Sequence, residues 1–193
     1  MNRKEQLNDS QKSFYASIME LHEKLDDAFL KNFNRSLPLN ETFVDRWDRA
    51  KKLGFGENTS IYDSSIVLGE VKVGSNCWVG PFTILDGSGK VEIGNFCTIS
   101  AGVHIYSHDN VMQTLSSGAM EIERQPVKIG NNVYIGPHAV ISKGVSIGDC
   151  CVIGAGTFVN RDVPSNSIVV GQPGRVTGTI EFTNGKPVFV YNK

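Results

Sequence analysis

The sequence predicts a mainly β protein: a three-sided parallel β-helix preceded by a helical segment. Three observations predict it. Aliphatic residues recur every six positions from residue 61, glycine often follows them directly, and a small or β-branched residue falls four positions after them. A chain that turns a corner every six residues closes a triangular coil in three hexads, whereas an amphipathic strand repeats every 2 and a helix every 3.6 residues. The 193 residues suffice for one such domain with an appendage.

The aliphatic positions define the course of the coils over residues 61–178. Each of these side chains is expected to point into the prism and to stack on its equivalents in the coils above and below. Glycine after it tolerates the backbone angles of a turn, and the small residue fits where the corner narrows. A two-residue insertion follows Leu85, and a longer break follows Ile105. The aliphatic positions are Ile61, Val67, Val73, Val79, Leu85, Ile93, Ile99, Ile105, Ile129, Ile135, Ile141, Ile147, Ile153 and Val159.

Residues 1–60 are predicted to form the helical segment. One helix is expected over residues 9–33, capped by Asp9 or Ser10. Leu37-Pro38 should then break the chain. The apolar face of this helix has the spacing i, i+4, i+7, i+11, i+15 and comprises Phe14, Ile18, Leu21, Leu25 and Phe29.

A second, shorter helix is expected after Asn40, running to about Leu53, where glycines stop it. Phe43 and Trp47 would share one of its faces. Two interpretations stay open: the helices cover the open end of the β-helix, whose last coil leaves backbone groups unpaired, or they contact the substrate.

Composition excludes several classes of protein. The formal net charge of −1 gives no general affinity for nucleic acid or anionic lipid. The polar N-terminus lacks the apolar core of a signal peptide, and no apolar run approaches the ~20 residues that span a bilayer, so we expect a cytoplasmic protein. Small buried packing residues, rather than disulfides or metal ligands, are expected at Cys77, Cys97, Cys150 and Cys151.

The repeat over about residues 61–178 resembles the hexapeptide-repeat acyltransferases, and among them the galactoside, maltose and bacterial polysaccharide O-acetyltransferases. This resemblance implies left-handed coils, against the usual right-handed crossover. It also implies a homotrimer with active sites between neighbouring prisms, and acetyl-CoA as the acyl donor without a metal. Residues 179–193 are predicted to form a hairpin around Asn184-Gly185, which covers the far end or reaches a neighbouring subunit.

The break after Ile105 predicts an active-site loop over about residues 108–127. His108 stands at its start, within Ser107-His108-Asp109. A hydroxyl needs a base before it can attack a thioester, and imidazole titrates near neutral pH. The resemblance implies the same role, since family members place a catalytic histidine at the start of this loop. Asp109 is expected to orient the ring or to meet the acceptor.

The C-terminal motifs imply a binding site for coenzyme A. A basic residue before Asp-Val-Pro and a Gly-x-Pro-x-Arg after it resemble the family signature. By this resemblance Ala155 contacts the pantetheine arm through its backbone, Asn160 and Arg161 lie by the adenine and phosphates, and Arg175 faces the 3′-phosphate. A planar guanidinium can bind two phosphate oxygens at once.

Two further positions are compared with the family. Relatives often carry serine at Pro137; proline has no N–H, so Gly136 or a van der Waals contact would take over the cofactor hydrogen bond. Relatives carry an acidic residue near the acceptor at Asp86, although Asp86-Gly87 is also a turn signal.

Three alternatives to a sugar O-acetyltransferase stay open. An amino-sugar N-acetyltransferase would keep the fold and cofactor. A zinc enzyme resembling the β-helix carbonic anhydrases would need His104, His108 and His138 to converge across a trimer interface. A non-catalytic solenoid would bind a partner on its repeat surface.

Overall fold

The computed structural model describes residues 3–192 and divides into two compact units, Met1–Asp45 and Arg46–Lys193. In the first unit a 3-10 turn (Arg3–Gln6) precedes the long helix α1 (Asp9–Phe33), as predicted. The predicted cap is wrong by one residue: Asn8 caps α1. Its Oδ1 accepts a hydrogen bond from Gln11 N (2.9 Å), while Gln11 Oε1 accepts one from Asn8 N (3.0 Å).

The prediction of one continuous second helix is wrong. Helix α2 (Leu39–Phe43) ends before Val44, whose backbone is extended (φ −102°, ψ 118°), and α3 (Arg46–Lys52) begins a new helix in the second unit. Valine loses rotamer freedom in a helix, which favours a break here.

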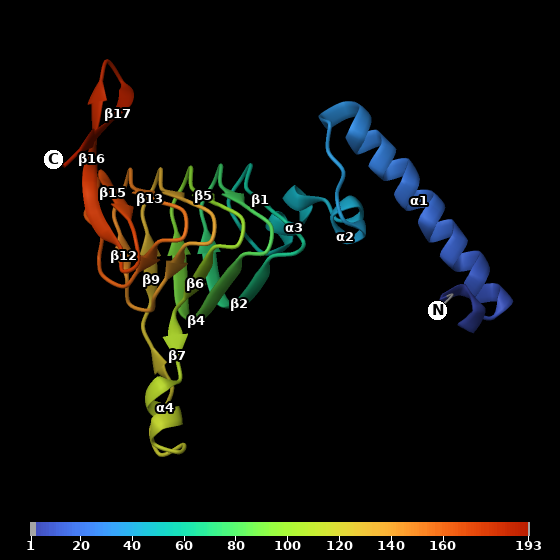
Figure 1. Cartoon of the computed structure of the whole chain (residues 1–193), viewed down its shortest axis with the longest axis horizontal. Coiled ribbons are helices and arrows are strands. Elements are labelled where there is room, and N and C mark those ends of the chain that lie inside the picture. Colours follow the sequence, from blue (N-terminus) through green and yellow to red (C-terminus); the bar gives the residue numbers. More distant parts are fainter. Residues whose placement is uncertain (1–2, 193) are drawn as a thin grey trace. The chain divides into compact units, whose positions relative to one another are not determined.

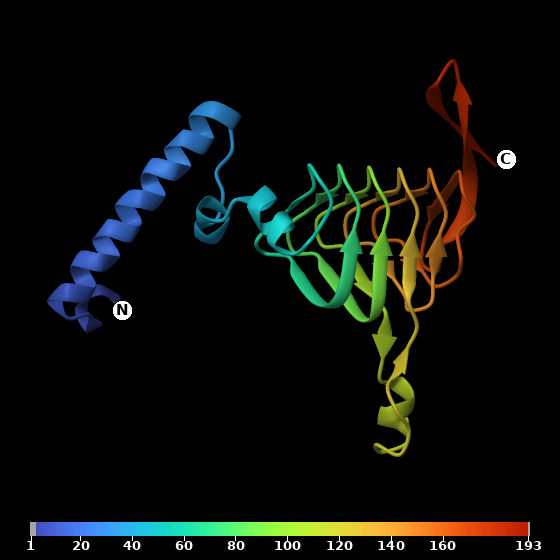
Figure 2. The same cartoon turned by 180° about the vertical axis from the view of Figure 1, so that it is seen from behind.

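The second unit is a parallel β-helix of about six turns (Figures 1 and 2). Its strands pair in parallel with the equivalent strand of the next coil, on three faces. The first face comprises β1 (Ser60–Ile61), β3 (Trp78–Val79), β5 (Thr98–Ile99), β10 (Tyr134–Ile135), β13 (Val152–Ile153) and β15 (Ser167–Val170). The long strands β2 (Ile66–Val73) and β4 (Ile84–Ile93) each serve both other faces. These faces continue in β6 (His104–Tyr106), β11 (Val140–Ile141) and β14 (Phe158–Val159), and in β9 (Val127–Ile129) and β12 (Ser146–Ile147).

The strand register confirms that the six-residue repeat builds the core. Equivalent aliphatic side chains stack in three columns inside the prism, and burial of such columns is the main driving force for a solenoid. The first column is Ile61, Val79, Ile99, Ile135, Ile153 and Val169. The second is Val67, Leu85, Ile105, Ile141 and Val159. The third is Val73, Ile93, Ile129, Ile147 and Val163.

All four cysteines are free, and three of them, Cys77, Cys97 and Cys151, are buried at the corners as predicted. The prediction is wrong for Cys150, which is half-buried. Each buried thiol donates to a backbone carbonyl of the next coil: Cys77 to Gly94 (3.2 Å), Cys97 to Gly130 (3.1 Å) and Cys151 to Pro164 (3.1 Å).

A hairpin ends the chain, and its turn lies at the predicted dipeptide. Strand β16 (Arg175–Thr183) pairs antiparallel with β15 and with β17 (Lys186–Tyr191), so the hairpin extends the first face. Asn184 and Gly185 both have positive φ, the conformation of a tight hairpin turn. Within residues 3–192, no helix combines the length and the apolar character needed to cross a membrane.

Candidate active site

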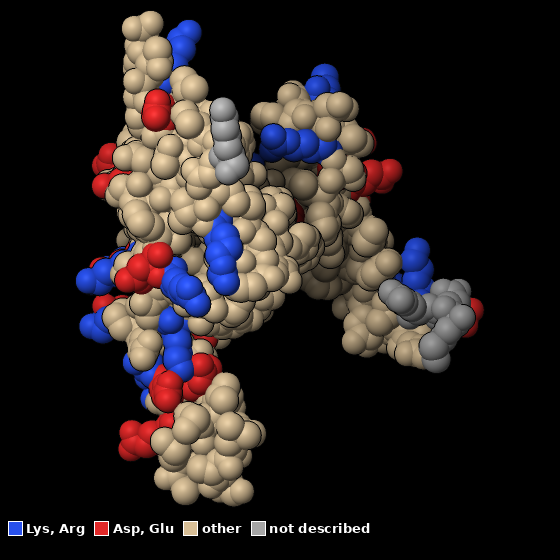
Figure 3. Space-filling model, turned by 60° about the vertical axis from the view of Figure 1, so that its left-hand side comes forward, with Lys and Arg blue, Asp and Glu red and all other residues tan. Residues whose placement is uncertain are grey.

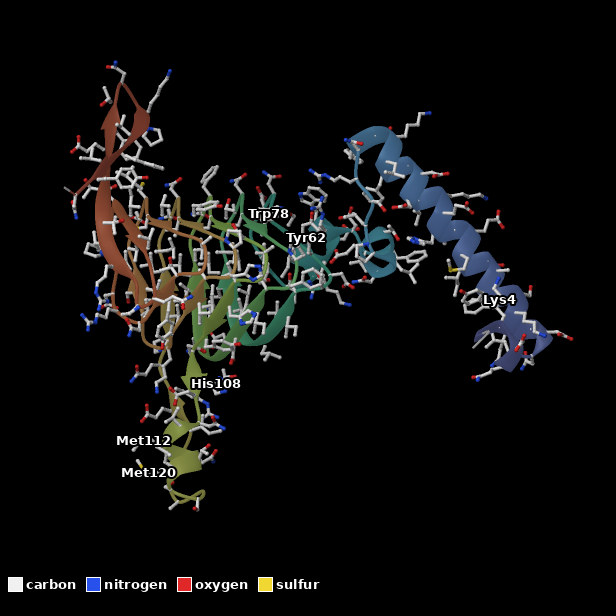
Figure 4. All side chains as sticks on the ribbon, in the orientation of Figure 1. Lys4, Tyr62, Trp78, His108, Met112 and Met120 are labelled. Carbon is white, nitrogen blue, oxygen red and sulfur yellow. The ribbon has the colours of Figure 1, made fainter. Side chains whose placement is uncertain are left out.

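Between β6 and β9 the chain leaves the β-helix in the loop that the break in the repeat predicts. Its neck is an antiparallel pair of short strands, β7 (His108–Asp109) and β8 (Glu123–Arg124), and its tip carries helix α4 (Val111–Leu115). His108 lies at the start of this excursion, with Met112 and Met120 farther out (Figure 4). The rigid β-helix thus holds His108 at the point where the loop begins.

A buried carboxylate lies against the His108 ring. Nδ1 of His108 is 2.6 Å from Oδ2 of Asp86, an ion-pair distance, although the pair does not meet hydrogen-bond geometry. The Asp86 side chain is 3% exposed and that of His108 is 32% exposed. The other carboxylate oxygen of Asp86 accepts a hydrogen bond from Ser88 N (2.9 Å). A carboxylate at Nδ1 favours the proton on that nitrogen and leaves Nε2 free to act as a base.

Ser107, the residue before His108, is hydrogen-bonded to the preceding coil. Its fully buried hydroxyl donates to the Asp86 carbonyl (2.5 Å) and accepts from Gly89 N (2.7 Å). The Ser107 amide also donates to the Asp86 carbonyl (3.1 Å). A side chain on Gly89 would place Cβ 2.3 Å from the Ser107 carbonyl oxygen, so glycine is required for this approach. Asp86 also has the turn role that Asp86-Gly87 predicts, because Ser88 N donates to its Oδ1 two residues back, as in an Asx turn, where β4 passes from one face to the next.

His108 and Asp109 line an open cavity of ≈320 Å³. Its wall mixes polar groups with two aromatic side chains and one aliphatic side chain. The remaining lining residues are Tyr106, Asn110, Val140, Ser142, Lys143 and Phe158. The buried Asp86 side chain does not line this cavity. Such a mixed wall suits a small polar ligand that presents both hydroxyl groups and C–H faces.

A second, smaller cavity of ≈190 Å³ brings Asn160, Arg161 and Arg175 together. Arg161 and Arg175 are exposed, with two guanidinium groups available to an anion. Strand β14 connects the two cavities, since Phe158 lines the first and the residues from Val159 onward line the second. Two arginines beside an amide side chain fit a phosphorylated ligand.

Gly136, Pro137 and Ala155 stack on consecutive coils and line neither cavity. The Pro137 carbonyl accepts a hydrogen bond from Gly156 N (2.8 Å), and the Gly136 amide donates to Ile153 O (2.8 Å). A side chain on Gly136 would lie 2.6 Å from Ala155 N, so glycine permits the close stacking of these coils. Ala155 itself is exposed.

The other two histidines of the β-helix do not line the first cavity, although His104 is next to two residues that do, Tyr106 and Val140. Nδ1 of His104 is 3.2 Å from the Tyr106 hydroxyl, and the two rings meet edge to face. His138 is exposed with φ +59°, and its ring lies over Gly102. Within the described part of a single chain, no three His, Cys, Asp or Glu side chains form a metal-binding group.

Two contacts at the site were not predicted from the sequence. Lys143 reaches the neck of the loop, with Nζ 2.6 Å from Asp109 Oδ2, and Asp86 faces His108. The repeat contained a signal for both. Its register aligns Leu85 with Ile105, and Ile105 with Ile141, so that residues just after these three positions must be neighbours.

Two family models match the chain. The model described as "Bacterial transferase hexapeptide (six repeats)" matches residues 126–161, and "Hexapeptide repeat of succinyl-transferase" matches residues 70–107. Galactoside O-acetyltransferase of Escherichia coli is 36% identical over 124 residues, which are 54% of this chain and 61% of that protein. The chain thus spans less than two thirds of this curated relative.

Solved structures extend the comparison to most of the chain. A maltose O-acetyltransferase from Clostridium difficile is 30% identical, with a TM-score of 0.59 over 86% of this chain and 88% of that one. An N-acyltransferase from Bacillus cereus, solved with dTDP and coenzyme A, is 23% identical and shares the fold, with a TM-score of 0.59 over 68% and 88% of the two chains. With its left-handed β-helix and its matched repeats, the chain belongs to the hexapeptide-repeat acetyltransferases.

Proposed function

We propose that this protein is an acetyl-CoA-dependent O-acetyltransferase that modifies a hydroxyl of a sugar or polysaccharide precursor, with His108 as the general base. The observation that carries the proposal is the pair of His108 and Asp86 at a mixed polar cavity. Family membership supports acetyl transfer as the reaction.

The proposed reaction needs one base. When bound, the thioester supplies an activated carbonyl carbon. Nε2 of His108 would accept the proton of the acceptor hydroxyl while the hydroxyl oxygen attacks that carbon. As the bond from that carbon to sulfur breaks, the imidazolium of His108 would return this proton to the leaving thiolate, which regenerates the base. The carboxylate of Asp86 at Nδ1 stabilises the imidazolium that forms. No covalent acetyl-enzyme is required.

The second cavity supports the donor part of the proposal. Asn160, Arg161 and Arg175 would hold the adenine and phosphates of coenzyme A, with bidentate guanidinium contacts to phosphate. Gly136, Pro137 and Ala155 would present backbone along the pantetheine arm. Asp109, at the rim of the first cavity, would meet the acceptor.

We place the working site between subunits of a homotrimer, as in the family that the sequence resembles, and the protein in the cytoplasm, where acetyl-CoA is available. Sedimentation equilibrium tests the trimer. It should give a molecular mass three times that of one chain, which is 21.1 kDa. A monomer that transfers acetyl groups at full rate would contradict a site shared between subunits.

An acceptor panel with radiolabelled acetyl-CoA tests the reaction. It should pair each sugar with its amino-sugar analogue, for example glucosides with glucosaminides and nucleotide sugars with nucleotide amino sugars. We expect label on the hydroxyl acceptors as a base-labile ester. Label found only on amino sugars, as a base-stable amide, would establish the N-acetyltransferase instead. Zinc at one ion per chain with no binding of acetyl-CoA would refute acetyl transfer.

A further inference from the structure

Lys143 joins the β-helix to both strands of the loop neck. It lies at the corner after β11, and its side chain is 15% exposed. Its Nζ is 2.6 Å from Asp109 Oδ2 on β7 and also donates to Glu123 Oε2 on β8. One ammonium group therefore holds two residues that are 14 positions apart in the sequence.

The two carboxylates need this cation. Asp109 and Glu123 are directly opposite each other in the antiparallel pair β7–β8, where like charges destabilise pairing. The hydrogen bond from Lys143, followed by one from Val111 N, lowers the pKa of Asp109. The hydrogen bonds to Asp109 and Glu123 raise the pKa of Lys143. Both directions favour the charged forms of the bridge.

The backbone beside Lys143 holds the same neck. Gly144 N donates to the Gln125 carbonyl (3.3 Å), and Gln125 N donates to the Ser107 carbonyl (2.9 Å). Gln125 thus connects the coil end of the neck to the residue before His108 and to the corner that carries Lys143. In Figure 3 charged side chains gather at the neck of the projecting loop and are absent from its tip, in agreement with the uncharged sequence of residues 110–120.

We propose that Lys143 is a positioning residue, whose bridge to Asp109 and Glu123 fixes the loop neck and thereby the His108 ring at the cavity. This inference rests on the proposed role of His108 as the base. Lys143 also lines the cavity with His108, so a displaced neck would change the geometry of the reacting groups directly. A misplacement of about 1 Å can lower a rate by roughly 10²-fold.

Four variants test the bridge by steady-state kinetics. Lys143→Met keeps the aliphatic stem, and we expect kcat to fall by about 10-fold to 10²-fold with little change in the KM for acetyl-CoA. Lys143→Arg should keep most of the activity, because a guanidinium can bind both carboxylates. Adding Glu123→Gln to Lys143→Met should recover part of kcat, since it removes the repulsion across the neck. The control is Lys72→Met, which removes an exposed ion pair with Glu70 on another face.

Two outcomes overturn the inference: a kcat for Lys143→Met equal to that of Lys72→Met, or no recovery on adding Glu123→Gln. A wild-type protein that transfers no acetyl group would refute the proposed function instead. In that case hydrogen exchange tests separately whether the Lys143 bridge holds the loop neck. In Lys143→Met the amides of Val111 and Gln125 should exchange faster than in Lys72→Met. Equal exchange rates in the two variants would refute the bridge whatever the activity.

Discussion

At the scale of single residues, the main feature of the site is the close approach of the Asp86 carboxylate to Nδ1 of His108. The carboxylate is almost fully buried and the ring is partly open to the cavity. A buried charge persists only when it is paired or hydrogen-bonded, and Asp86 meets Ser88 N on one oxygen and His108 on the other. The mechanism we propose uses this arrangement to hold the base in one tautomer.

Asp86→Asn tests that arrangement because it keeps the shape of the side chain and removes its charge. We expect a lower kcat with an unchanged KM for acetyl-CoA, and a smaller loss than His108→Ala gives. The double variant Asp86→Asn/His108→Ala should be no slower than His108→Ala alone, since residues that act as a unit are not additive. Full additivity of the two losses would show that Asp86 acts independently of His108.

Arg175→Ala tests the second cavity. Removing one of its two guanidinium groups should raise the KM for acetyl-CoA, with a much smaller effect on kcat. The matched control is Arg35→Ala, an exposed arginine that lies outside that cavity and outside the loop neck. Initial rates over a range of acetyl-CoA concentrations measure both constants, and an unchanged KM would remove Arg175 from the donor site.

At the scale of the elements, the three aliphatic columns should dominate stability. Ile135 is fully buried in the first column, between Ile99 and Ile153. Ile135→Ala should lower the free energy of unfolding by about 2–5 kcal/mol, through lost burial and a cavity. Ile66→Ala is the control, because Ile66 is 50% exposed. Denaturant unfolding at one fixed protein concentration compares the two; similar losses would contradict a column core.

The elements also show how far the sequence predicts this fold. The six-residue repeat predicts the coils, the three columns and the loop, because each hexad repeats one local conformation. The sequence does not predict the break at Val44, because the helical pattern after Asn40 continues across this residue, whose backbone is extended. The repeat places Asp86 and His108 on adjacent coils, but the insertion after Leu85 obscures how their side chains meet. The repeat likewise places Lys143 on the coil next to the one that leads into His108. The neck that Lys143 contacts follows no repeat, so periodicity does not predict its ion pairs with Asp109 and Glu123.

At the scale of the whole molecule, the β-helix is a rigid support from which one loop departs. The support supplies Asp86, Ser107 and Lys143, and the loop supplies His108 and Asp109. A side chain at the start of a loop that contacts the coils at three points is held more firmly than one on a free loop. Under the function that we propose, this division lets a stack of similar coils carry one reactive site.

The central claim is that His108 is the base for acetyl transfer, and His108→Ala tests it most directly. Two quantities should be measured on the same preparation: kcat with the best acceptor, and the affinity for coenzyme A by calorimetry. We predict that kcat falls by roughly 10²–10⁴-fold while the affinity for coenzyme A stays within about twofold of the wild-type value, because the arginines of the second cavity are untouched. A variant that turns over at nearly the wild-type rate would contradict the account.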